Sequence, residues 1–149
     1  MSPTPYLEAL QARFLDALPH ARELGMQARE VTAEAAHLEL PYRPDFLGDP
    51  QHGLLHPGVI TSVIDTASGL AVFAQIGRFE PIATLDLRVD YLRPGLAGQA
   101  LQVRAECYRM TPMIAFVRAQ AWQADPQSPV ALSQSVFMRA SHGRRQAAA

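Results

Sequence analysis

The longest apolar run in the chain, residues 54–73, constrains the fold more than any other feature. Pro57 suits the first turn of a helix, because an N–H at that position has no partner inside the helix. Apolar side chains then recur at steps of three and four residues, which predicts a helix. They are Ile60, Val63, Ile64, Ala67, Leu70, Ala71 and Ala74. Because apolar side chains also cover most of the remaining circumference, we expect this helix to be buried.

A narrow polar stripe runs along the same helix. Thr61, Asp65 and Ser68 follow one another at steps of four and three, so they share one face. These polar residues argue against a membrane-spanning helix. A buried carboxylate is costly unless it is paired or used in chemistry. Asp65 is therefore the first candidate for a functional residue.

Composition narrows the class of protein. A length of 149 residues predicts a single domain over residues 1–149. The 13 basic and 14 acidic side chains form no basic stripe, so we expect no nucleic-acid partner. The single cysteine, Cys107, excludes an internal disulfide, and the first residues lack the pattern of a signal peptide. We therefore expect a cytoplasmic protein, and because no ligand spacing fits a metal, we expect no metal.

The rest of the chain predicts one short helix and a set of strands. Residues 3–18 carry an apolar stripe that Thr4 can cap, and Pro19 should end this helix. Alternation of apolar and polar residues predicts the strands. They lie at residues 24–32, 35–42, 83–93, 101–108, 113–123 and 129–140. Residues 43–53 form a loop that we expect to fold over the start of the long helix, and residues 141–149 are expected to be disordered.

The order of these elements predicts an α+β fold. Short turns join the last four strands, which we expect to form a meander in an antiparallel sheet. One long apolar helix with about six strands favours a curved sheet wrapped around that helix.

This arrangement, together with two motifs, resembles the hotdog fold and its PaaI-like acyl-CoA thioesterases. The first motif is Leu55-His56-Pro57-Gly58-Val59 followed by Asp65-Thr66-Ala67-Ser68-Gly69-Leu70-Ala71. It is similar to the family's His-Gly-Gly helix start with an acid on the second turn. The second motif, residues 84–94, is similar to the family's strand that ends in Leu-Arg-Pro. Order and spacing agree over residues 20–140.

The resemblance implies a homodimer or a dimer of dimers (a homotetramer), with sheets joined side by side and an active site at the subunit interface. The substrate it implies is a coenzyme A thioester, with no separate cofactor. Asp65 takes the role of nucleophile or general base, His56 that of the family's histidine, and Thr84 that of a hydroxyl near the attacking water. We further expect the substrate to meet Pro57, Ser68 and Arg93, the last through the phosphates of coenzyme A.

Two residues depart from the family pattern. Pro57 stands where the family has the glycine whose N–H binds the thioester oxygen, and proline has no N–H. Gly58 is the nearest candidate donor. Pro50 stands where the family has an asparagine, for which Asp49 or Gln51 could substitute.

Helix geometry adds a separate argument for a shared site. Gly58 and Asp65 are seven residues apart, or about 10 Å along a helix, which is too far to serve one carbonyl group. The two residues could meet around one thioester only if they came from two subunits.

Alternatives remain at this point. A hotdog dehydratase acting on 3-hydroxyacyl thioesters has a similar Pro-Gly-Val helix start, but its acid lies closer to the glycine. A non-catalytic module that binds acyl-CoA or a lipid is compatible with Pro57. Asp65 could instead pair with an arginine, His56 could orient its loop, and Thr84 could be an ordinary strand residue. The acyl group, small aryl or medium-chain, is left open.

Overall fold

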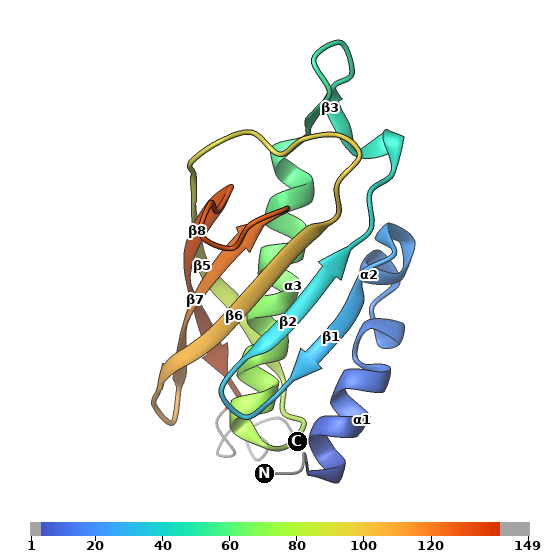
Figure 1. Ribbon diagram of the computed structural model, residues 1–149. Helices are drawn as coiled ribbons and strands as arrows, with labels where there is room; N and C mark the ends of the chain where they lie inside the picture. The colour runs from blue at the N-terminus through green and yellow to red at the C-terminus, as the bar shows by residue number, and fades with distance from the viewer. Residues whose placement is uncertain (1–3, 141–149) are drawn as a thin grey trace, which may run out of the picture.

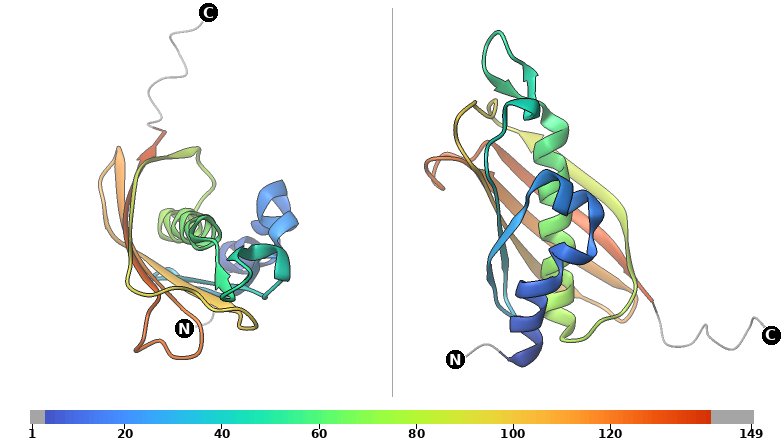
Figure 2. Two further views of the ribbon diagram at one scale, coloured as in Figure 1. Left: turned by 90° about the horizontal axis from the view of Figure 1, so that it is seen from above. Right: turned by 90° about the vertical axis from the view of Figure 1, so that its right-hand side faces the viewer.

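A six-stranded antiparallel sheet wraps around one long helix, α3 (Pro57–Ile76), in the computed structural model, which describes residues 4–140. Figure 1 shows α3 running through the middle of the molecule, and Figure 2 shows the sheet curving around it. The predicted α+β architecture is confirmed. The predicted disorder of residues 141–149 lies outside the described residues.

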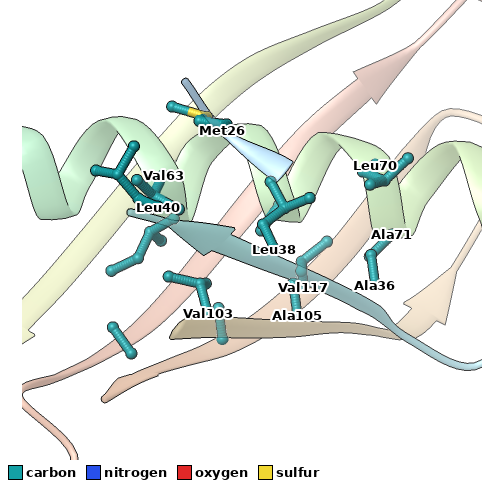
Figure 3. Close-up of a cluster of buried hydrophobic side chains, with 14 of the residues drawn as sticks. Met26, Ala36, Leu38, Leu40, Val63, Leu70, Ala71, Val103, Ala105 and Val117 are labelled. Atoms are coloured by element: carbon teal, nitrogen blue, oxygen red, sulfur yellow. The ribbon is translucent and has the colours of Figure 1, made fainter. Parts of the chain in front are cut away.

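The burial of α3 follows from its sequence. Ten of its residues are buried, and the leucine and valine side chains of the neighbouring strands pack against it (Figure 3). Labelled examples are Leu38, Leu40, Val103 and Val117. By length and composition alone this helix could also cross a membrane, but here it packs in the core. Gly77, with φ of 74°, ends the helix in the left-handed conformation that glycine adopts without strain.

The N-terminal segment differs from the single predicted helix. It forms α1 (Pro5–Arg13), the short 3-10 turn η1 (Leu15–Ala17) and α2 (Pro19–Leu24). Thr4 caps α1 as predicted, since its Oγ1 accepts a hydrogen bond from the N–H of Leu7. Pro19 begins α2 instead of only ending the helix before it, because proline at a first helical position loses no hydrogen bond.

The strands lie close to their predicted positions. Their bounds are β1 (Gln27–Val31), β2 (Ala36–Leu40), β5 (Ile82–Tyr91), β6 (Leu101–Met110), β7 (Ile114–Trp122) and β8 (Ala131–Arg139). The sheet order is β1-β2-β6-β7-β8-β5, so the prediction of a four-strand meander is wrong. β5 pairs with β8 at one end of the sheet, whereas β6 pairs with β2. Alternation along a strand shows which face is buried, but it contains no information on which strands are neighbours.

The crossing between β5 and β6 shapes the amino end of α3. Residues 92–100 carry the chain across this end, where they meet the hairpin of β3 (Leu47–Asp49) and β4 (Leu54–Leu55) (Figure 1). The N–H of Leu55 donates to the carbonyl of Gly95 at 2.9 Å. The predicted loop 43–53 does lie at the helix start, but it includes β3 and the 3-10 turn η2 (Pro44–Phe46).

A buried ion pair connects the segment after α3 to the last strand. The Glu80 side chain is 3% exposed, and it accepts hydrogen bonds from Arg139 at 2.7 Å and from Arg78 at 2.9 Å. The hydrogen bond from Arg139 holds the pKa of the Glu80 carboxyl below its ordinary value of 4.5, although burial opposes this shift. Because the folded pKa is lower than the unfolded one, the pair stabilises the fold above pH 4.5. That contribution is lost as the pH falls through the lowered value.

We expect Glu80→Gln to reduce the free energy of unfolding at pH 7 by about 3 kcal/mol, the cost of breaking a buried pair. The difference from wild type should shrink as the pH falls below 4.5 and through the lowered pKa of Glu80, because the wild-type carboxyl then becomes protonated. Urea denaturation at several pH values measures both effects. Glu34→Gln, at an exposed turn, is the control, and an equal loss at all pH values would contradict the expectation.

Candidate active site

Asp65 and Thr84 form the centre of the candidate site. Thr84 Oγ1, on β5, donates a hydrogen bond to Asp65 Oδ1 on α3 at 3.0 Å. The pairing of β5 with β8 shifts register between Thr84 and Asp86, and such a bulge re-aims side chains in a strand. The structure therefore brings together two residues that sequence analysis had selected on separate motifs.

The surroundings of Asp65 differ from those of a structural ion pair. Its side chain is half-buried, and within residues 4–140 no arginine, lysine or histidine lies at ion-pair distance from it. A carboxylate that accepts from one hydroxyl group keeps further lone pairs for a water molecule. This arrangement suits a base that accepts a proton.

His56 caps the amino end of α3 with its side chain. Its Nδ1 accepts a hydrogen bond from the N–H of Gly58 at 2.9 Å. Gly58 was the expected donor for the thioester oxygen, so the structure gives this N–H a different partner. The physical reason is that a helix start leaves its first N–H groups unpaired, and the side chain just before the helix is the nearest acceptor.

Two glycines make room for the His56 ring. A Cβ at Gly58 would lie 2.9 Å from His56 Nδ1, and a Cβ at Gly48 would lie 2.9 Å from His56 Cα and 3.3 Å from its Cδ2. The N–H of His56 also donates to the carbonyl of Phe46 at 2.9 Å. The ring is therefore confined on both sides by backbone that only glycine allows to come so close.

A cavity of about 470 Å³ opens beside this helix start. Its walls come from the β3–β4 hairpin, the first turn of α3 and residues 91–95. The predicted residues His56, Pro57 and Arg93 line it, and the exposed Arg93 is placed at its rim. Asp49 also lines it, but both of its carboxylate oxygens accept hydrogen bonds from His52.

Tyr91 is a site residue that sequence analysis missed. Its hydroxyl donates to the carbonyl of Pro57 at 3.3 Å and contacts Thr61 Oγ1. The alternation of β5 assigned Tyr91 only to the apolar face of the strand. The sequence could have indicated this contact, because a tyrosine that faces a helix start must find a partner for its hydroxyl group.

Ser68 lies elsewhere than expected. Its side chain is fully buried, and its Oγ has no hydrogen-bond partner among the described residues. A Cβ at the neighbouring Gly69 would lie 3.9 Å from Ile82 of β5 and Phe137 of β8, so the sheet covers this half of α3. Sequence analysis correctly placed Ser68 on the same face of α3 as Asp65. The curved sheet, however, covers that face toward the carboxyl end of the helix. Ser68 does not line the cavity at the helix start, and its contact with substrate stays a prediction.

A larger hollow, about 550 Å³, lies on the outer face of the sheet, away from α3. Its arginines are already paired with carboxylates, Arg88 with Asp90 and both Arg104 and Arg118 with Glu106. Because this hollow contains none of the predicted catalytic residues, we assign the candidate site to the smaller cavity and to the Asp65–Thr84 pair.

A curved antiparallel sheet wrapped around one long helix is the architecture of the hotdog class of proteins. The family model of the thioesterase superfamily matches residues 52–130. The chain belongs to this superfamily, and the prediction of a thioester hydrolase is confirmed at the level of the family.

Individual relatives agree with this assignment. The medium/long-chain acyl-CoA thioesterase YigI of Escherichia coli K12 is 32% identical over 127 residues, which cover 76% of this chain and 81% of the relative. A crystal structure of a Pseudomonas aeruginosa protein is 39% identical, with a TM-score of 0.81 over 91% of this chain and all of that one. The E. coli PaaI protein from the phenylacetic acid degradation operon has a TM-score of 0.81 over 94% of this chain and 97% of its own. At 20% identity, PaaI shows the shared fold alone.

We expect Gly58→Ala to displace the His56 ring, because the new Cβ would lie 2.9 Å from Nδ1. Loss of the cap should reduce the free energy of unfolding by about 1 kcal/mol. Gly69→Ala is the matched control on the same helix, since its Cβ meets atoms only at 3.9 Å and alanine favours the helix. Thermal denaturation compares the two variants, and equal or greater stability of Gly58→Ala would contradict the expected clash.

Proposed function

We propose that this protein hydrolyses acyl-CoA thioesters, with Asp65 activating the attacking water. The observation that carries the proposal is the hydrogen bond of 3.0 Å between Thr84 Oγ1 and Asp65 Oδ1, on a helix face that the sheet leaves partly open. Thr84 orients the carboxylate or the water beside it. The reaction needs no cofactor, because a carboxylate and hydrogen-bond donors suffice for it.

The chemistry proceeds by addition and elimination. Asp65 accepts a proton from water while the water oxygen bonds to the thioester carbon, and the electron pair of the C=O bond moves onto its oxygen. Collapse of this intermediate breaks the C–S bond and releases the carboxylic acid. The coenzyme A thiolate takes up the proton and leaves as a thiol. The positive amino end of the α3 dipole favours the negative charge that develops on this oxygen.

The acyl group is proposed to be medium-chain or small aryl. The name of the E. coli relative, a medium/long-chain acyl-CoA thioesterase, supports the longer aliphatic group. Arg93, exposed at the rim of the cavity, is proposed to contact a phosphate group of coenzyme A.

We further propose that two subunits share each site, in a homodimer or a dimer of dimers. The outer edge of β5 has no partner strand within the described residues, and Leu85 on it is 56% exposed. Such an edge is suited to pairing with another strand. Antiparallel pairing of two β5 strands along their length would bring the Thr84 end of one beside the Tyr91 end of the other. Because Thr84 holds Asp65 and Tyr91 holds the helix start, this pairing would unite the two halves of the site.

Asp65→Asn should lower kcat by about 10³-fold or more while the fold is retained, because the amide cannot accept the proton of water. The experiment is a thiol-release screen over aryl and aliphatic acyl-CoA esters of increasing length. Asp86→Asn, an exposed aspartate on the same strand as Thr84, is the control. Near-normal turnover by Asp65→Asn would remove the assignment, and hydration of crotonyl-CoA in the same screen would favour the dehydratase.

Mixing two inactive variants tests the shared site. In a dimer formed by Asp65→Asn and His56→Ala chains, one site has both changes and the other has neither. Random exchange of subunits should therefore restore about a quarter of wild-type activity, since half of the dimers are mixed and each has one intact site. No recovery after subunit exchange, verified with tagged chains, would contradict a site built from two subunits.

A second candidate function is binding of acyl-CoA without hydrolysis. It is favoured by Pro57, which has no N–H, and by the use of the Gly58 N–H in the helix cap. Calorimetric titration with acyl-CoA distinguishes the two functions. Tight binding without thiol release would support this second function over the first.

A further inference from the structure

The first turn of α3 has no free backbone donor at its first three positions. Pro57 has no N–H, the Gly58 N–H donates to His56 Nδ1 at 2.9 Å, and the Val59 N–H donates to the carbonyl of His56 at 3.0 Å. An oxygen atom that approaches this end of the helix must therefore find its hydrogen bond elsewhere.

The cap determines the tautomer of the neutral His56 ring. The N–H of Gly58 can only donate, so Nδ1 must accept and has no hydrogen of its own. In the neutral ring, the hydrogen is then on Nε2. The hydrogen bond thus converts His56 into a donor at its far end.

The position of the ring directs this donor outward. Gly48 and Gly58 lie against the two sides of the ring, as the distances for an added Cβ show, and the backbone of His56 is bound to Phe46. Nε2 is at the end of the ring away from its own Cβ. His56 lines the cavity of about 470 Å³, is exposed, and makes no hydrogen bond through Nε2 to any residue between 4 and 140.

We infer that the Nε2–H of His56 donates to the thioester oxygen and stabilises its negative charge during hydrolysis. It thereby replaces the N–H that Pro57 lacks. This inference rests on the proposed thioesterase function, which it deepens by assigning the donor. No proton is transferred, because the neutral ring keeps its hydrogen while the oxygen gains and then loses its charge.

The same geometry excludes His56 as the general base in this arrangement. A base needs a free lone pair, but that of Nδ1 accepts from Gly58 and Nε2 has a hydrogen. The proton of water therefore goes to Asp65, and the two residues have complementary tasks. His56 acts on the carbonyl oxygen, and Asp65 acts on the water.

The test uses a variant that keeps the cap and removes the donor. Asparagine is among the preferred residues at this position of a helix, so His56→Asn should still accept from the Gly58 N–H. Its shorter side chain does not reach the position of Nε2. We expect kcat with the preferred acyl-CoA to fall about 10²–10³-fold, as on removal of one oxyanion donor, with a smaller change in KM. His20→Asn, an exposed histidine on α2, is the control.

A second substitution distinguishes a role of His56 as hydrogen-bond donor from a merely structural role. Pro57→Ala supplies the missing N–H at the first position of the helix. In the His56→Asn background it should raise kcat at least about tenfold, and this proportional gain should be larger than in the wild type, where His56 already supplies the donor. Melting temperatures of the single and double variants verify that all are folded.

The outcomes are distinct. The role of His56 would be overturned if His56→Asn kept the wild-type kcat. It would also be overturned if Pro57→Ala changed kcat by the same factor in both backgrounds. In either case the thioesterase function would stand. A wild-type protein that releases no thiol from any acyl-CoA would overturn the proposed function and the role of His56 together.

Discussion

The structure depends on burying α3 on most of its surface while its amino end stays open. Each large aliphatic side chain of this helix contributes about 1.5–3 kcal/mol when it is fully buried. One sheet covers such a helix only by curving around it, which places β1 and β5 at opposite edges. The chain must then cross from β5 to β6 over the helix start, where residues 92–100 meet the β3–β4 hairpin. The cavity at the helix start is a consequence of this crossing.

Backbone chemistry at the helix start decides which groups remain for a substrate. Proline at the first position gives a favourable helix start, but it removes a donor. The His56 ring caps the next N–H, and this is possible because neither Gly48 nor Gly58 has a Cβ. Stability of the helix and chemistry at its amino end are therefore coupled through one imidazole ring.

Much of the fold could be predicted from the sequence, and so could the central pair of the site. The periods of the apolar residues indicated the buried helix and the strands, because those periods follow directly from local backbone geometry. The cost of a buried carboxylate selected Asp65. The four-strand meander was wrong and the second short helix, α2, was missed, since both depend on how separate elements pack. The contact of Ser68 with substrate stays a prediction.

The sequence by itself determined which residues are apolar, which helix they form, and that Pro57 lacks a donor. Only the tertiary structure decided that β5 lies beside β8, that Thr84 reaches Asp65, and that Tyr91 reaches the helix start. It also decided that the Gly58 N–H binds His56. The physical reason is that local periodicity acts over a few residues, whereas these contacts depend on the curvature of a sheet around a helix.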